Sequence, residues 1–323
     1  MEKTLDIVLL LALPASGKSE VRRYLANVPE ESLRRDFHIG ETLQIDDFPY
    51  VHLMRRIDDE LAALGKDRVF FKSGDKPFKN PKDWGTLIQL INEDYADLMT
   101  KKVSNPASAG LFIMERIEKA AELSGIDYRL AGVDKESKDT VAEKIEKECR
   151  KLLDEKHAAY PASFDGKTIV IEAARGGAHG SAMPLQAPFG YKYSLAQLSP
   201  EILKRAVILY VWVTPEESRR KNAARTDPND PGSILHHGVP IDVMMGDYGC
   251  DDMDWLEQNS EKPGTIAIEA HGGVFHLPIG RFDNRVDKTS FLREEKAKWS
   301  KEDVAGVHEG IRSALDKVFK MQG

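Results

Sequence analysis

Short apolar runs that alternate with amphipathic stretches organise the chain. The runs Leu5–Leu13 and Ala206–Val213 are apolar at nearly every position, and Thr168–Ile171 is a shorter run that ends at Glu172. Runs that are apolar on both faces are typical of buried strands in a parallel sheet. Two more short strands are predicted at Thr42–Ile45 and at Thr265–Ile268, the second as the last strand of the core.

Helical spacing of apolar residues fills the segments between these strands. A helix is predicted to begin near Gly17, and another runs from Val51 to Leu64. The region 76–162 holds several stripes with apolar residues three and four apart, which predicts a helical region. Asn105-Pro106 is expected to begin one of its helices, as N-cap and first helical residue.

Strand and helix alternation predicts the fold class and the domain organisation. We expect an α/β fold, a parallel sheet with helices on both faces. Residues 1–75 and 163–290 would form its discontinuous core, and 76–162 a helical insertion or cap. A C-terminal helix within 291–323, begun by the capping pair Ser300 and Asp303, would pack on the core.

Composition and charge narrow the function. The 323 residues carry a net charge of −7, which disfavours a nucleic-acid partner. No apolar run approaches the ~20 residues of a membrane-spanning helix. With only Cys149 and Cys250, a disulfide framework is not expected, and a cytoplasmic location is the simplest interpretation. The run 7–13 could pass for the apolar part of a signal peptide, but it is at the short limit of length, and Glu2 and Asp6 precede it.

The segment Ala12–Ser19 carries the most specific chemistry. It reads Ala-Leu-Pro-Ala-Ser-Gly-Lys-Ser and fits the phosphate-binding pattern G-x-x-x-x-G-K-[ST] except at its first position. In that pattern backbone N–H groups face phosphate oxygens, the lysine reaches the β- and γ-phosphates, and the hydroxyl ligates Mg²⁺. The residues expected to bind the nucleotide are Pro14, Ala15, Ser16, Gly17, Lys18 and Ser19. Ala12 costs little if its φ is negative and strains the loop if φ is positive.

This loop resembles that of the P-loop kinases of small metabolites and nucleotides, which include adenylate, uridine, gluconate and pantothenate kinases. The resemblance covers the first strand, loop and helix closely, the other strand ends only in outline, and the helical middle not at all. It implies a P-loop NTPase-type sheet, ATP and Mg²⁺ as cofactors, and a small molecule as phosphoryl acceptor. The chain contains no guanine-reading Asn-Lys-x-Asp, which favours ATP over GTP.

In such kinases an acid after the second core strand often handles the acceptor. Here Ile45-Asp46-Asp47-Phe48-Pro49-Tyr50 is similar to the Asp-x-Phe-Tyr pattern of the uridine kinase group. A carboxylate at this place can orient an attacking hydroxyl and accept its proton. Alternatively, Asp46 and Asp47 cap the following helix. Asp46 is the first choice for catalysis, because Asp47 is better placed to cap.

The end of the strand at 168–171 offers a metal ligand and a substrate contact. Glu172 has the position of a Walker B-like acid that holds Mg²⁺ directly or through water, although acids at strand ends are common. Arg175, Gly176 and Gly177 follow, and an arginine in a glycine-rich turn suits an anionic or polar substrate. A flexible turn with a solvated arginine is the alternative.

A charged helix at Pro215–Arg225 is the expected lid. In several P-loop kinases arginines of such a helix close over the transferring phosphoryl group. If Glu216–Arg220 and Glu217–Lys221 form ion pairs along the helix, Arg219 and Arg225 are left for this role.

The loop Thr226–Cys250 would complete the lid and exclude water. A zinc site made of His236, His237, Asp247 and Cys250 matches no standard ligand spacing.

The predicted reaction is transfer of the γ-phosphoryl group of Mg-ATP to a hydroxyl or phosphate of a small metabolite, nucleoside or nucleotide. Lys18, Asp46, Asp47, Arg219 and Arg225 are the expected catalytic residues, and Ser19 and Glu172 the metal ligands. The main alternative is a regulatory ATPase or switch whose helical middle binds a protein partner. A kinase of proteins or nucleic-acid ends, and a degenerate binding protein, are further alternatives. Stimulation of ATP turnover by a small molecule discriminates between them.

Overall fold

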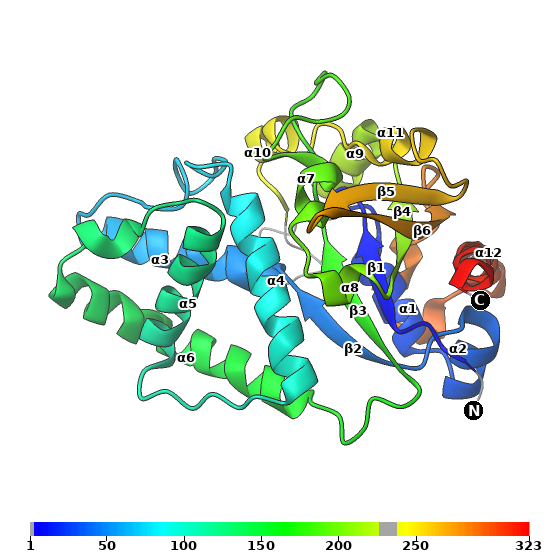
Figure 1. Ribbon diagram of the computed structural model, residues 1–323, viewed down its shortest axis with the longest axis horizontal. Coiled ribbons are helices and arrows are strands. Elements are labelled where there is room, and N and C mark those ends of the chain that lie inside the picture. Colours follow the sequence, from blue (N-terminus) through cyan, green and yellow to red (C-terminus); the bar gives the residue numbers. More distant parts are fainter. Residues whose placement is uncertain (1–2, 226–237, 323) are drawn as a thin grey trace.

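A six-stranded sheet forms the centre of the molecule in the computed structural model, which describes residues 3–225 and 238–322 (Figure 1). The strand order is β2-β3-β1-β4-β6-β5, and every neighbouring pair is parallel except β5 with β6. The strands are β1 (Ile7–Leu11), β2 (Glu41–Asp46), β3 (Lys167–Ala173), β4 (Ala206–Trp212), β5 (Thr265–Ala270) and β6 (Gly273–Asp283). The predicted α/β fold with a mostly parallel sheet is therefore confirmed.

The central strand β1 shows why a continuous apolar run was needed. Ile7, Leu9 and Leu11 enter the core on one face of the sheet, while Val8 and Leu10 enter the core on the other. All five are at most 2% exposed. A strand covered on both faces has no polar side, so its sequence is apolar throughout.

Helices cover both faces of the sheet. One face packs against α1 (Lys18–Ala26), α2 (Glu30–Phe37) and α12 (Lys301–Gln322). The other packs against α4 (Asp83–Thr100), α7 (Gly190–Ala196), α8 (Pro200–Leu203) and α11 (Met253–Gln258). The remaining helices are α3 (Phe48–Ala63), α5 (Ala109–Leu123), α6 (Lys135–Ala158), α9 (Pro215–Arg225) and α10 (Ile241–Gly246), with 3-10 turns at Arg129–Gly132, Ser290–Arg293 and Lys296–Lys298.

Four helices build a second apolar core beside the sheet, at the left of Figure 1. Residues of α3, α5 and α6 pack together there, and α4 joins this core with Trp84 and Leu87 while its Ile88 and Ile91 face the sheet. The helical core therefore takes in α3, which lies before residue 76, the expected start of the helical segment.

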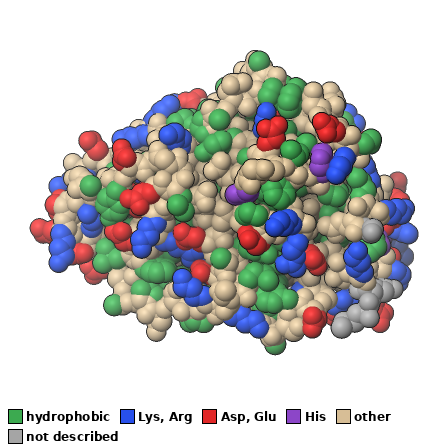
Figure 2. All heavy atoms as spheres, in the orientation of Figure 1, with side chains coloured by type: hydrophobic (Ala, Val, Ile, Leu, Met, Phe, Trp, Pro, Cys, Tyr) green, Lys and Arg blue, Asp and Glu red, His purple; other side chains and the backbone are tan. Residues whose placement is uncertain are grey.

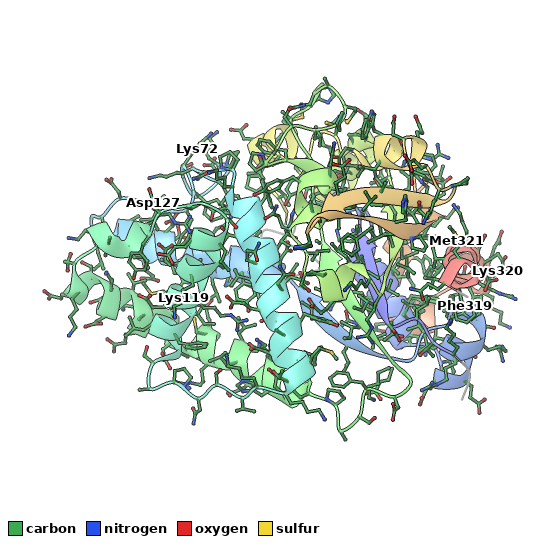
Figure 3. All side chains as sticks on the ribbon, viewed as in Figure 1. Lys72, Lys119, Asp127, Phe319, Lys320 and Met321 are labelled. Carbon is green, nitrogen blue, oxygen red and sulfur yellow. The ribbon has the colours of Figure 1, made fainter. Side chains whose placement is uncertain are left out.

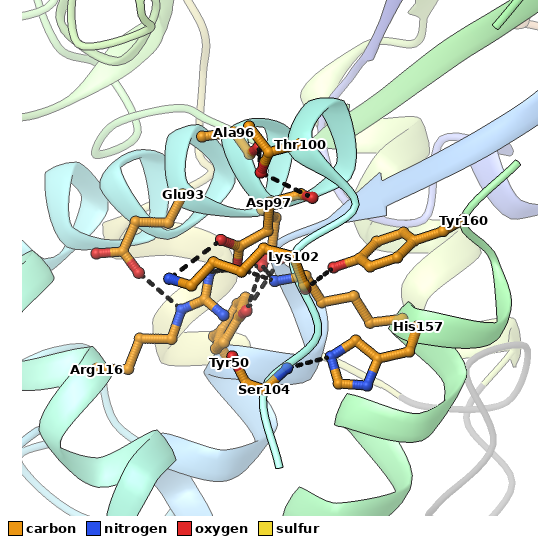
Figure 4. Close-up of polar contacts among 12 residues, drawn as sticks. Tyr50, Glu93, Ala96, Asp97, Thr100, Lys102, Ser104, Arg116, His157 and Tyr160 are labelled. Carbon is orange, nitrogen blue, oxygen red and sulfur yellow. Dashed lines mark hydrogen bonds and ion pairs between the residues drawn. The ribbon is translucent and has the colours of Figure 1, made fainter. Parts of the chain in front are cut away.

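Buried ion pairs tie these helices together (Figure 4). Arg116 of α5 pairs with Glu93 at 2.7 Å and with Asp94 at 2.8 Å, both on α4. Lys156 of α6 pairs with Asp97 of α4 at 2.7 Å. Because every charge in this cluster has a partner of opposite sign, its role is structural.

Two details of the sequence interpretation are wrong. Asn105-Pro106 does not begin a helix; α5 starts at Ala109, and the side chain of Ser108 accepts a hydrogen bond from the N–H of Leu111 at 3.2 Å. The last core strand is not β5 but β6, which lies parallel to β4 and places β5 at the sheet edge.

The C-terminal helix α12 begins as predicted. The Ser300 hydroxyl donates to Asp303 at 2.6 Å and accepts from the Asp303 N–H at 3.0 Å. The C-terminal end of α12, with Phe319, Lys320 and Met321, lies on the opposite side of the molecule from Lys72 (Figure 3). Among the described residues, no helix has the length and apolarity that crossing a membrane requires. Figure 2 shows basic and acidic side chains interspersed on one face.

Candidate functional site

The candidate site lies at the carboxyl end of β1, between its two neighbouring strands, β3 and β4. The chain connects to these two strands on opposite sides of β1. From β1 the chain runs out to β2 and returns through β3, and it later crosses to β4 on the other side. At such a switch point the connections diverge and leave a crevice outside the carboxyl ends of the strands. The segment Ala12–Ser19, here called the 12–19 loop, connects β1 to α1 at this crevice.

Backbone geometry in the 12–19 loop explains part of its sequence. Gly17 has a φ of 108°, and a Cβ there would lie 2.5 Å from Oγ1 of Thr289. Both the conformation and the close approach require glycine. Ala15 has a φ of 55°, which is costly for a residue with a side chain. Ala12 is fully buried and is not among the positive-φ residues, so alanine at this position does not strain the loop.

A cavity of about 150 Å³ brings most of the expected site residues together. One half is polar. Its lining residues from the 12–19 loop are Pro14, Ala15, Ser16, Gly17, Lys18 and Ser19, and the carboxylates are Asp46, Asp47 and Glu172. The cavity therefore joins the expected phosphate loop to all three expected acids.

The carboxylates of Asp46 and Glu172 are neighbours because their strands are. The two residues are direct partners in the parallel pairing of β2 with β3. Arg22 of α1 bridges them, with Nη1 2.8 Å from Oε2 of Glu172 and 3.3 Å from Oδ2 of Asp46. Burial, with the charges of Glu172 and Asp47 nearby, raises the pKa of Asp46 to about 7. A carboxyl group with such a pKa can exchange a proton near neutral pH.

The two aspartates do not divide their roles as expected. Asp47 is the N-cap residue of α3 but makes no side-chain capping bond. Asp46 accepts a hydrogen bond from the Phe48 N–H at 2.9 Å instead. The Asp47 carboxylate forms an ion pair with Nη1 of Arg175 at 2.6 Å. The reason given for preferring Asp46, that Asp47 caps the helix, is therefore wrong.

Arg175, Gly176 and Gly177 lie behind the cavity wall. Arg175 is 2% exposed, and its guanidinium carbon lies 5.1 Å from the ring centroid of Trp84. Gly177 donates its N–H to the carbonyl of Cys250 at 2.9 Å, and a Cβ on Gly176 would meet the same carbonyl at 2.5 Å. In the described part of the chain none of the three lines the cavity. Direct contact with a substrate stays a prediction that this geometry does not favour.

The oxygen ligands expected for Mg²⁺ are present in the cavity. Ser19 and Glu172 both line it. Within the described residues no group of three or more His, Cys, Asp or Glu side chains could hold a metal by itself. That donor set fits Mg²⁺, which in nucleotide enzymes takes one or two protein oxygens and completes its shell with phosphate and water. It does not fit a metal held by protein alone.

The helix α9 carries arginines whose pairing differs from the expectation. Arg219 pairs with Glu216 at 3.0 Å, and Arg220 pairs with Glu217 at 2.7 Å, each three residues apart. Arg219 therefore has a local partner, although its Nη1 is buried with no hydrogen bond among the described residues. The side chain of Arg225 lies outside the described part of the chain, as do His236 and His237 of the zinc alternative.

A buried network supports the 12–19 loop from behind. Ser218 of α9 donates to the carbonyl of Pro14 at 2.7 Å, and Asn284 after β6 donates to the carbonyl of Ser16 at 2.6 Å. Lys221, only 1% exposed, pairs with Asp287 at 2.8 Å and contacts Thr289. The helix expected to be a lid is thus fastened to the loop by hydrogen bonds.

The second half of the cavity is aromatic. Its lining includes the rings of Phe48, Phe71, Phe78, Trp84 and Tyr248. Two charged side chains interrupt this wall, Arg55 and Asp247. Burial raises the pKa of Asp247 to about 6, against the opposing effect of Lys72 and Arg55.

Sequence reasoning missed Arg22, Asn284 and the aromatic wall. Arg22 lies four residues after Lys18, on the same side of α1, and this spacing was a usable signal. The wall comes from segments far apart in the chain, and no local pattern indicates it.

The comparisons with known proteins give no relative: no family model, no curated protein and no solved structure matches this chain.

Proposed function

We propose that the protein is a phosphotransferase that moves the γ-phosphoryl group of Mg-ATP to a hydroxyl or phosphate of a small molecule. One observation carries the proposal. The 12–19 loop, with Lys18 and Ser19, shares a cavity with the carboxylates of Asp46, Asp47 and Glu172 at the switch point of a mostly parallel sheet. Phosphoryl transfer needs both parts, a loop that holds phosphates and an acid near the attacking group.

The residues that line the cavity have roles that follow from their places, whereas the roles of Arg219 and Arg225 rest on the sequence. Backbone N–H groups at the start of α1 would bind phosphate oxygens, and Lys18 would neutralise their charge. Ser19 and Glu172 would hold Mg²⁺, which would supply neutralisation of the charge on the phosphoryl group that ATP donates. Asp46, with Asp47 beside it, would orient the acceptor and take its proton. We assign Arg219 and Arg225 of α9 to the charge of the transferred group.

A regulatory ATPase is the weaker candidate. A switch needs to hold water and nucleotide only, whereas this cavity continues beyond the carboxylates into an aromatic half. That additional space supports a second, organic substrate.

Consumption of Mg-ATP in a pooled metabolite extract tests the proposal. We expect ATP loss that requires both the extract and Lys18, and Lys18→Ala should lower the rate by at least about 100-fold. Lys204→Ala, which changes an exposed lysine away from the cavity, is the matched control. Slow ATP loss that is indifferent to the extract would contradict phosphotransfer and favour the regulatory ATPase.

A further inference from the structure

Four aromatic rings that line the cavity form a continuous row. The rings of Phe71 and Phe78 stack with centroids 4.5 Å apart, and Trp84 lies edge-on to Phe78 at 5.0 Å. Tyr248 continues this row, 5.4 Å from Trp84. We propose that this row binds the phosphoryl acceptor, and that the acceptor carries a flat aromatic or heteroaromatic ring. The inference rests on the proposed phosphotransfer.

The order of residues along α3 assigns this half to the acceptor and not to the base of the nucleotide. Asp47 precedes the helix, and Phe48, Val51 and Arg55 follow at helical spacing, all lining the cavity. Residues three and four apart share one side of a helix. A molecule that presents a hydroxyl to the carboxylates therefore extends along this side of α3 into the aromatic half. The phosphate donor reaches the carboxylates from the 12–19 loop.

One acidic group in the wall bears on what the ring carries. Asp247 is 6% exposed and lines the cavity, where its carboxylate interacts electrostatically with Lys72 and Arg55. An acid in a largely buried site selects for a ligand that offers it a hydrogen-bond donor. The ring is accordingly expected to offer an N–H or amino donor to Asp247.

Arg55 also lines this part of the cavity, but its guanidinium group already has partners within the protein. Its guanidinium carbon lies 3.9 Å from the ring centroid of Phe71, and Nη1 donates to the carbonyl of Gly74 at 2.7 Å. Stacked and hydrogen-bonded in this way, Arg55 holds Phe71 in place. The wall around the ring therefore combines aromatic side chains with the carboxylate of Asp247.

The test is to isolate the acceptor from the extract by its Mg-ATP-dependent conversion and to record its near-ultraviolet spectrum. We expect an absorbing ring compound. In parallel, uridine, adenosine and pyridoxine are compared with glycerol, ribose and gluconate as acceptors. An isolated acceptor without a ring, or stimulation by the ringless alcohols alone, would overturn the inference and leave phosphotransfer standing. ATP loss that ignores the extract would instead reject the proposed function.

Variants separate ring recognition from folding. Trp84→Leu and Phe78→Leu each remove a ring from the row. Both are expected to raise KM for the acceptor about 10-fold while KM for ATP stays unchanged. Trp299→Leu, outside the cavity, is the matched control. Unchanged acceptor KM in both variants, or competition of the ring compound with ATP for binding, would contradict the assignment.

Discussion

Ala12 is the residue at which the loop departs from the phosphate-binding pattern, and the structure gives the reason. The residue is fully buried in the core between the sheet and the helices α1, α2 and α12. Its carbonyl accepts a hydrogen bond from the Tyr191 hydroxyl at 2.9 Å. Its φ is not positive, so glycine has no conformational advantage here. The departure from the pattern therefore does not indicate a degenerate loop.

Restoring the glycine should then bring no gain. We expect Ala12→Gly to lower the free energy of unfolding by about 1 kcal/mol, because it removes a buried methyl group and makes the unfolded chain more flexible. Urea unfolding measures this change. ATP consumption should not increase, and an increase would show that alanine does strain the loop.

A buried acid in the aromatic half predicts a pH dependence of stability. Burial raises the pKa of Asp247 to about 6, above its value in the unfolded chain, so the folded protein binds this proton more tightly. The stabilisation is complete below the unfolded pKa of ~4 and is lost as the pH rises through the folded value.

Asp247→Asn should remove this loss of stability at high pH, because asparagine does not ionise. The variant should be more stable than the natural chain by up to about 3 kcal/mol at pH ~8, with no difference near pH ~4. Urea unfolding at the two pH values measures it. A natural chain that is the more stable one at the higher pH would mean that Lys72 and Arg55 outweigh the burial of Asp247.

At the scale of elements, the loop after β6 and the helix α9 hold the 12–19 loop in shape. Asn284 is fully buried; it donates to the Ser16 carbonyl, and its own side-chain oxygen accepts from the Lys288 N–H at 2.7 Å. A loop that binds phosphate by backbone N–H groups depends on such support, since its amides must keep their directions.

Asn284→Ala should therefore weaken ATP binding through the loop, although Asn284 itself does not line the cavity. We expect KM for ATP to rise about 10-fold, with a smaller change in KM for the acceptor. Steady-state kinetics with each substrate varied in turn is the measurement. The control is Asn259→Ala, which changes an exposed amide that donates to the Trp255 carbonyl of α11. Equal changes in both KM values would indicate general unfolding and not loop support.

The strands and helices were predictable to different degrees for a physical reason. β1 and β4 are buried on both faces, and their apolar runs indicate them without any tertiary information. β6 begins exposed and becomes buried only in its second half, and it contains Pro278 and Gly280. A Cβ on Gly280 would lie 2.1 Å from the carbonyl of Ala314 in α12. Glycine is therefore required here because the helix packs closely against the strand. No local pattern contains that information.

At the scale of the whole molecule, a bound ligand should stabilise the folded chain. Ligand at about 100 times its Kd contributes about 2.7 kcal/mol, which corresponds to a rise in Tm of several degrees. Mg-ATP should give this rise, and the acceptor should add to it because the two occupy different halves of one cavity. Thermal unfolding with each ligand and with both measures it. Lys18→Ala should abolish the effect of Mg-ATP and keep that of the acceptor.

The polar half of the site was predictable and the aromatic half was not. Asp46 is the last residue of β2, Glu172 is the last but one of β3, and Lys18 begins the helix after β1. All three therefore lie near the carboxyl ends of parallel strands, which meet at one edge of the sheet. The aromatic wall assembles only when α3, the loop before α4 and the segment after α10 fold together. Phe71 and Tyr248 are remote in sequence, and each by itself looks like an ordinary core residue.

A crystal structure of the protein with Mg²⁺ and a non-hydrolysable ATP analogue tests the central claim most directly. We predict the β- and γ-phosphates at the backbone amides of the 12–19 loop and at Lys18, with the metal at Ser19 and on the side of Glu172. The terminal phosphate should face Asp46 and leave the aromatic half open. Phosphates bound elsewhere, or an adenine ring stacked in the row of Phe71, Phe78 and Trp84, would contradict the account.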